Sequence, residues 1–105
     1  MKQALIGVDV GTSSARAGVF DESGMLLATA RHPITTWHEA GSVVEQSSTD
    51  IWAACVASVR AAMADAALPA SAVKGIGFDA TCSLVVLDAG GNPLRSARRA
   101  THAAT

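Results

Sequence analysis

The segment SSTDIWAACVASVRAAMADAAL, residues 47–68, carries a sustained helical period. Ser47 and Asp50 stand in capping-box spacing at its start, and Pro69 follows its end. One apolar stripe recurs every four positions, at Ile51, Cys55, Val59 and Met63. We therefore predict a helix of about five turns, and we expect Trp52 to belong to the core as well.

Short apolar runs that read as β-strands lie on both sides of this segment. Three strands are expected before the helix and two after it, over residues 3–10, 15–21, 25–34, 73–80 and 83–89. Glu22, Ser23 and Gly24 form a hairpin turn between the second and third strands, and residues 89–92, AGGN, predict another tight turn. Residues 33–46 read as an ordered loop with an extended piece at 42–45. The order predicts an α/β fold that opens with a three-stranded antiparallel meander.

Length and composition limit the classes of function. A chain of 105 residues, half of them apolar, can bury the core of one modest domain, and a second full domain does not fit. A formal net charge of -1 gives no electrostatic reason to expect nucleic acid or an anionic membrane as a partner. Cys55 and Cys82 do not form a C-x-x-C pattern, and no stretch approaches the roughly 20 apolar residues of a membrane span. We expect a soluble, cytoplasmic protein.

The composition changes after Leu94. Residues 95–105, RSARRATHAAT, hold three arginines within five positions and no large apolar side chain. We therefore expect a domain over residues 1–94 and a divergent, disordered tail over 95–105.

The stretch GVDVGTSSAR, residues 7–16, places a carboxylate inside an apolar strand and ends it in a hydroxyl-rich turn. Gly11 lets the backbone approach an anion, the hydroxyls that follow can donate to phosphate oxygens, and Asp9 can hold Mg²⁺. The chain contains no G-x-x-x-x-G-K-[ST] motif, which excludes the ordinary P-loop. The alternative is an ordinary hairpin turn capped by Asp9, since these residue types are common turn formers.

Three motifs in order carry a family resemblance. The pattern D-x-G-T-x-x-x-R is formed by Asp9, Gly11, Thr12 and Arg16; VEQSSTDIW (44–52) and GIGFDATCSLVVLD (75–88) follow it. Together they resemble the FGGY carbohydrate kinases, within the actin, hexokinase and Hsp70 superfamily of ribonuclease H-like folds. The phrase FDATCS is closest to the D-ribulokinase-like branch. The resemblance implies a partial ribonuclease H-like N-terminal domain over residues 3 to about 94.

This resemblance implies transfer of a phosphoryl group from ATP to a pentulose such as D-ribulose, with Mg²⁺. Asp9 would face the metal. The residues implied at the nucleotide phosphates are Gly11, Thr12, Ser13, Ser14 and Arg16. Those implied at the sugar are Asp79, Thr81 and Cys82. Asp79 could instead be a turn residue and Cys82 a packing residue, and we expect structural roles for Trp37, His38 and Glu45.

The sequence also departs from the family. It lacks the W-x-D-x-R segment, the aspartate that acts as catalytic base and a second domain, so no residue is expected to be catalytic. We expect an N-terminal fragment of a kinase, from a truncated or frameshifted gene and inactive alone, with sugar and ATP as small-molecule partners. Two alternatives stay open: a non-catalytic module that binds nucleotide or sugar, or an unstable truncated product. A homo-oligomer is compatible with either.

Overall fold

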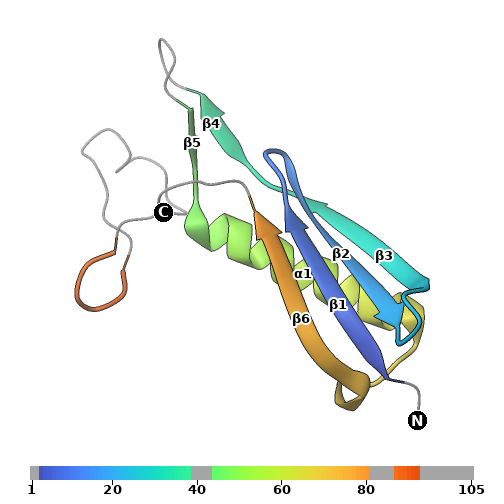
Figure 1. Ribbon diagram of the computed structural model, residues 1–105. Coiled ribbons are helices and arrows are strands. Elements are labelled where there is room, and N and C mark those ends of the chain that lie inside the picture. The colour runs from blue at the N-terminus through green and yellow to red at the C-terminus, as the bar shows by residue number, and fades with distance from the viewer. Residues whose placement is uncertain (1–2, 39–43, 81–86, 93–105) are drawn as a thin grey trace.

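A computed structural model describes residues 3–38, 44–80 and 87–92 of the chain. A four-stranded sheet in the order β3-β2-β1-β6 is covered on one face by a single helix (Figure 1). The elements are β1 (Ala4–Val10), β2 (Ser14–Asp21), β3 (Leu26–Pro33), α1 (Ser48–Ala66) and β6 (Val73–Ala80). The strands β1, β2 and β3 form the predicted antiparallel meander, and β6 lies parallel to β1. The prediction of an α/β fold is confirmed.

Alternation along the strands separates a helix-facing side of the sheet from an outer side. The buried positions of β1 are Ala4, Ile6, Val8 and Val10, whereas the residues between them are more exposed. In β2, Ala15, Ala17 and Val19 occupy the same buried side. Because side chains on a strand alternate between faces, Asp9 belongs to the outer side. The carboxylate can therefore stand in an apolar strand without entering the core.

Helix α1 meets the sheet through small side chains, and Trp52 lies on the other side of the helix. The buried residues of the helix are Ala54, Cys55, Ser58 and Ala62, and the predicted stripe residues Ile51, Val59 and Met63 flank them, partly buried. Trp52 is 63% exposed, and at about 100° per residue it lies roughly 200° around the helix from Ala54. The expectation of a core tryptophan was wrong. Burial raises the pKa of the Cys55 thiol.

Both ends of α1 have local caps. The Ser47 hydroxyl accepts a hydrogen bond from the backbone N–H of Asp50 at 3.2 Å. Ala67 adopts a left-handed conformation with φ 56°, and its N–H donates to the Ala64 carbonyl. The helix thus ends just before the predicted limit. The Asp50 carboxylate accepts from the Thr35 N–H at 2.7 Å and ties the start of α1 to the chain that follows β3.

The predicted loop at 33–46 contains a two-stranded antiparallel ribbon of β4 (Thr36–His38) and β5 (Val44–Gln46). The extended piece was predicted at 42–45, and β5 overlaps it. The ribbon projects beyond the sheet, next to the β1–β2 turn (Figure 1). A short 3-10 helix, η1 (Ala70–Ala72), leads into β6.

Two turns share one hydrogen-bond pattern. In the β2–β3 turn, the N–H of Asp21 donates to the Met25 carbonyl and Gly24 has φ 88°. In the predicted turn near the end of the described chain, the N–H of Asp88 donates to the Asn92 carbonyl and Gly91 has φ 83°. Both predicted turns are therefore confirmed. Most of the predicted strand at 83–89, with Thr81, Cys82 and residues 95–105, lies outside the described residues.

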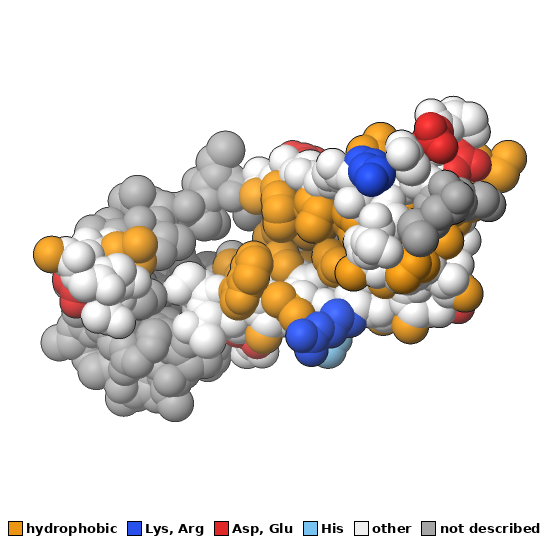
Figure 2. Space-filling view, turned by 90° about the horizontal axis from the view of Figure 1, so that it is seen from below, with side chains coloured by type: hydrophobic (Ala, Val, Ile, Leu, Met, Phe, Trp, Pro, Cys, Tyr) orange, Lys and Arg blue, Asp and Glu red, His pale blue; other side chains and the backbone are white. Residues whose placement is uncertain are grey.

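The helix covers only part of the sheet. It packs over β2 and β3 and only marginally over β1, and hydrophobic side chains gather in the middle of the face shown in Figure 2. Trp52, Ile76 and Phe78 are all more than half exposed. Among the described residues, no helix combines the length and apolar character needed to cross a membrane.

Candidate functional site

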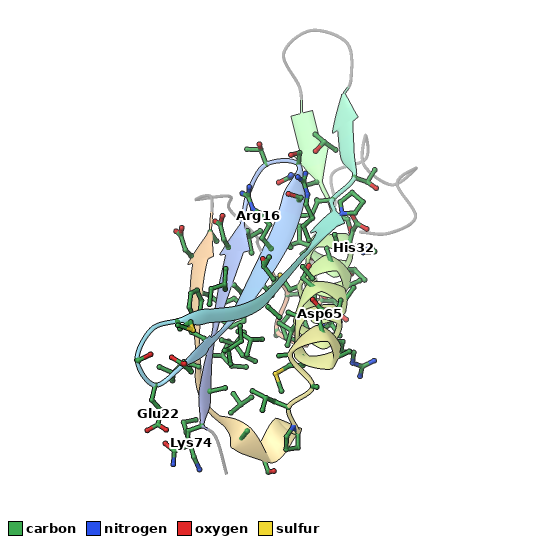
Figure 3. All side chains as sticks on the ribbon, turned by 90° about the vertical axis from the view of Figure 1, so that its right-hand side faces the viewer. Arg16, Glu22, His32, Asp65 and Lys74 are labelled. Atoms are coloured by element: carbon green, nitrogen blue, oxygen red, sulfur yellow. The ribbon has the colours of Figure 1, made fainter. Side chains whose placement is uncertain are left out.

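The turn between β1 and β2 carries the first predicted motif. Val10 ends β1 and Ser14 begins β2, and the N–H of Gly11 donates to the Ser14 carbonyl at 2.9 Å. Asp9 and Arg16 are directly opposite each other in the antiparallel pair. Arg16 Nη2 lies 3.0 Å from Asp9 Oδ2, and both side chains are about half exposed. Arg16 lies toward the turn end of the sheet, whereas Glu22 and Lys74 lie at the opposite end (Figure 3).

Asp79 lies beside Asp9. The two residues are register partners in the parallel pair of β1 and β6, so their side chains belong to the same face of the sheet. The same register continues from Arg16 on β2 to Arg31 on β3. A row across the outer face therefore reads Asp79, Asp9, Arg16, Arg31, with two acidic side chains followed by two basic ones. Such a row can hold a cation at one end and attract phosphate oxygens at the other.

Gly11 lies close to the Arg16 side chain and to the backbone of Ser14. A Cβ built on this residue would lie 2.6 Å from Arg16 Nη2 and 3.3 Å from the Ser14 carbonyl oxygen. The guanidinium of Arg16 therefore occupies the volume that a side chain at this position would fill. The sequence predicted a close approach of an anion to Gly11, and the structure adds a cationic group at the same point.

The hydroxyl residues of the turn differ in exposure. Thr12 and Ser13 are exposed, whereas Ser14 is only 2% exposed. Of the residues implied at the phosphates, the structure therefore places Gly11, Thr12, Ser13 and Arg16 on the accessible side, and it places Ser14 within the fold. Of the residues implied at the sugar, it describes only Asp79, which is exposed at the carboxyl end of β6.

Sequence reasoning missed Gln46, although this residue ends the VEQ motif. The Gln46 side-chain amide donates to the Thr12 carbonyl at 2.8 Å, and the Thr36 hydroxyl lies 3.4 Å from the same oxygen. The N–H of Ile34 donates to the Ser13 carbonyl at 2.9 Å. The ribbon and the chain before it therefore support the turn from behind. The signal was present as a motif, but nothing in the spacing showed that it would contact the turn.

The donor set suits Mg²⁺ that arrives with phosphate. Mg²⁺ prefers oxygen ligands and often binds through one or two carboxylates together with water and substrate phosphates. Asp9 and Asp79 provide such carboxylates on neighbouring strands, with one oxygen of Asp9 engaged by Arg16. Within the described part of the chain, no group of three or more His, Cys, Asp or Glu side chains is arranged to hold a metal by itself. The residues present therefore fit a shared metal site better than an all-protein one.

The sheet, helix and turn define an α/β protein with the fold of sugar kinases. A solved structure described as a "xyloylose kinase" from Brucella ovis superimposes with a TM-score of 0.82 at 26% identity, covering 89% of this chain and 20% of that one. The xylulose kinase from Rhodospirillum rubrum gives a TM-score of 0.79 at 25% identity, covering 89% of this chain and 19% of that one. The actin/hexokinase-like fold predicted from the sequence is confirmed.

Sequence comparison gives the family. Residues 4–103 match the N-terminal domain of the FGGY family of carbohydrate kinases, and the chain belongs to this family. It is 51% identical over 89 residues to the human FGGY carbohydrate kinase domain-containing protein, and the aligned region covers 85% of this chain and 16% of the relative. It is 48% identical over 84 residues to D-ribulokinase from Saccharomyces cerevisiae, and the aligned region covers 80% of this chain and 12% of the relative. The chain thus spans less than a fifth of the length of these two relatives.

Proposed function

We propose that this chain is the phosphate-loop part of an ATP-dependent kinase that phosphorylates a pentulose such as D-ribulose. The observation that carries the proposal is the placement of Asp9 and Asp79 side by side at the carboxyl ends of two parallel strands, next to the exposed turn at Thr12 and Ser13. Ligands of α/β sheets bind at this end of the strands. The identity to the yeast D-ribulokinase supports a pentulose as the acceptor.

In this proposal each residue of the row has its own part. Asp9 holds Mg²⁺, and the ion, when bound, neutralises charge on the phosphate oxygens. Arg16 places a permanent positive charge beside the turn, and Thr12 and Ser13 offer donors to the phosphates. Ser14, being buried, keeps the turn in place. Gly11 leaves room for the guanidinium of Arg16.

Asp79, with Thr81 and Cys82 after it in the chain, serves the sugar. A carboxylate can accept hydrogen bonds from substrate hydroxyls and so disfavours a ligand that lacks them. Phosphoryl transfer also needs a positioned base and an aligned nucleotide, and the sequence contains no W-x-D-x-R segment. We therefore propose that these 105 residues bind but do not turn over substrate on their own.

A chimera tests the proposal. Residues 4–94 replace the matching segment of the yeast D-ribulokinase, and ADP release is followed with D-ribulose, D-xylulose and glycerol. We expect activity on D-ribulose above the other two acceptors. Asp9→Asn should lower it by about a hundredfold or more, because the substitution removes a charged metal ligand. Glu22→Gln, at the opposite end of the sheet, is the matched control and should leave it unchanged.

Three results would count against the proposal. The first is an Asp9→Asn chimera as active as its parent, and the second is a preference for glycerol or xylulose. The third concerns the isolated chain: sugar-dependent ADP release by the 105 residues alone would overturn the expectation that they bind without turnover. Binding of MgATP or D-ribulose by the isolated chain, without turnover, is the expected result.

A further inference from the structure

Three consecutive carbonyl groups at the β1–β2 turn accept hydrogen bonds from within the protein. The Thr12 carbonyl accepts from Gln46 at 2.8 Å, the Ser13 carbonyl from the N–H of Ile34 at 2.9 Å, and the Ser14 carbonyl from the N–H of Gly11 at 2.9 Å. Three consecutive acceptors are thus used internally. Because these three carbonyl oxygens are already hydrogen-bonded within the protein, they repel an approaching anion less than unpaired carbonyl oxygens would.

We infer that Gln46 is a positioning residue: its side-chain amide fixes the Thr12–Ser13 peptide so that the N–H of Ser13 is presented to a nucleotide phosphate. The inference rests on the proposed function for the identity of the ligand. The described chain contains no cis peptide bond, and in a trans peptide the C=O and the following N–H point in opposite directions. Because Gln46 holds the Thr12 C=O from the ribbon side, the N–H of Ser13 points away from the ribbon.

The position of Gln46 makes it suitable for this task. It is the last residue of β5 and is paired with Thr36 across the ribbon. Its amide nitrogen also lies 3.4 Å from the Thr36 hydroxyl. The next residue, Ser47, is fully buried and begins the cap of α1. The amide is therefore connected through a short stretch of backbone to the buried, capped start of the helix, while the turn that it holds exposes Thr12 and Ser13.

The chemistry of the side chain is specific. The Gln46 nitrogen carries two donor hydrogens, whereas a glutamate of the same shape is only an acceptor when ionised. In Gln46→Glu, a carboxylate oxygen would face the Thr12 carbonyl oxygen, and the repulsion would turn the Thr12–Ser13 peptide away. In Gln46→Met, the donor is lost without repulsion. The two variants should therefore disturb the turn to different degrees while changing side-chain size little.

The test uses ¹⁵N NMR of the full 105-residue chain with MgATP as the probe. Without ligand, the Ser13 amide signal should shift and broaden in Gln46→Glu, and less so in Gln46→Met. With MgATP, the parent should show a saturable shift at Ser13, and Gln46→Glu should bind about tenfold or more weakly. Gln3→Glu is the matched control, because it makes the same charge change at the exposed start of the chain. Thermal unfolding is measured for all four proteins.

The two levels of the inference fail in different ways. A Ser13 amide that is the same in the parent, Gln46→Glu and Gln46→Met would overturn the positioning role, whatever the chain binds. A loss of affinity that merely follows a lower unfolding temperature would also overturn it. The turn could instead be disturbed in the two Gln46 variants as expected, while the parent shows no shift at Ser13 with MgATP. That result would overturn the phosphate role and with it the proposed function.

Discussion

Replacement of Val19 by alanine tests whether the chain by itself builds the core described above. Val19 lies on β2 with no exposed surface, between the sheet and α1. Removing two methyl groups costs about 1.6 kcal/mol at about 0.8 kcal/mol per buried group. A remaining cavity of about 40 Å³ adds about 1 kcal/mol at about 24 cal/mol per Å³. We therefore expect the free energy of unfolding to fall by about 2.5 kcal/mol.

Urea denaturation followed by circular dichroism measures this change. For a domain of this size, the same change should lower the unfolding temperature by about 10–20 °C. Met25→Ala is the control, because Met25 is 64% exposed in the β2–β3 turn, and its loss should cost less than about 0.5 kcal/mol. Equal losses for the two variants, or a parent chain without a cooperative transition, would refute the reasoning. The second result would favour the unstable-fragment alternative.

Two further predictions concern the outer face and the second turn. Gly77→Ala should raise the free energy of unfolding by about 0.5–1 kcal/mol, since nothing lies within 4 Å of a Cβ there and the unfolded chain loses freedom. Gly18→Ala should not gain in urea denaturation, because its Cβ would lie 3.0 Å from Phe20 Cε1; equal gains would contradict this. Hydrogen bonds, first that from the backbone N–H of Asn92, lower the pKa of Asp88. The stabilisation that these hydrogen bonds give is therefore complete above about pH 4 and is lost as the pH falls through the lowered pKa. In an NMR titration, the chemical shift of the Asn92 amide should follow this protonation. An Asn92 shift that does not change with pH would contradict the prediction.

The strands and the helix could be predicted because local patterns determine them. The apolar runs, the glycine of the β2–β3 turn and the capping serine of α1 each report a nearby backbone conformation. Asp9 could also be selected as a candidate, because it is a carboxylate in an otherwise apolar strand, and Asp79 could be selected through the family resemblance of residues 75–88. Their pairing in one register could not be predicted, since it depends on the parallel placement of β6 against β1.

The errors and omissions come from tertiary structure. Trp52 was expected in the core because it was assigned to the apolar stripe of the helix, but α1 meets the sheet through Ala54, Ser58 and Ala62. Small residues carry a weak signal in a sequence, although they allow the closest approach of a helix to a sheet. Gln46 was missed because it lies 34 positions from Thr12 in the chain, and no periodicity links the two.

The ion pair between Asp9 and Arg16 has a further consequence for the proposed function. The two side chains are about half exposed, and pairs of this kind contribute about 0–1 kcal/mol to stability. The pair therefore costs little to separate, so in the proposed function Asp9 can bind a metal ion and Arg16 can turn toward a phosphate without unfolding the turn. The turn itself is held by a separate contact, the hydrogen bond from the Gln46 side-chain amide to the Thr12 carbonyl at 2.8 Å. A weak ion pair beside a turn that is held separately would let the charged side chains bind and release a phosphate while the turn keeps its shape.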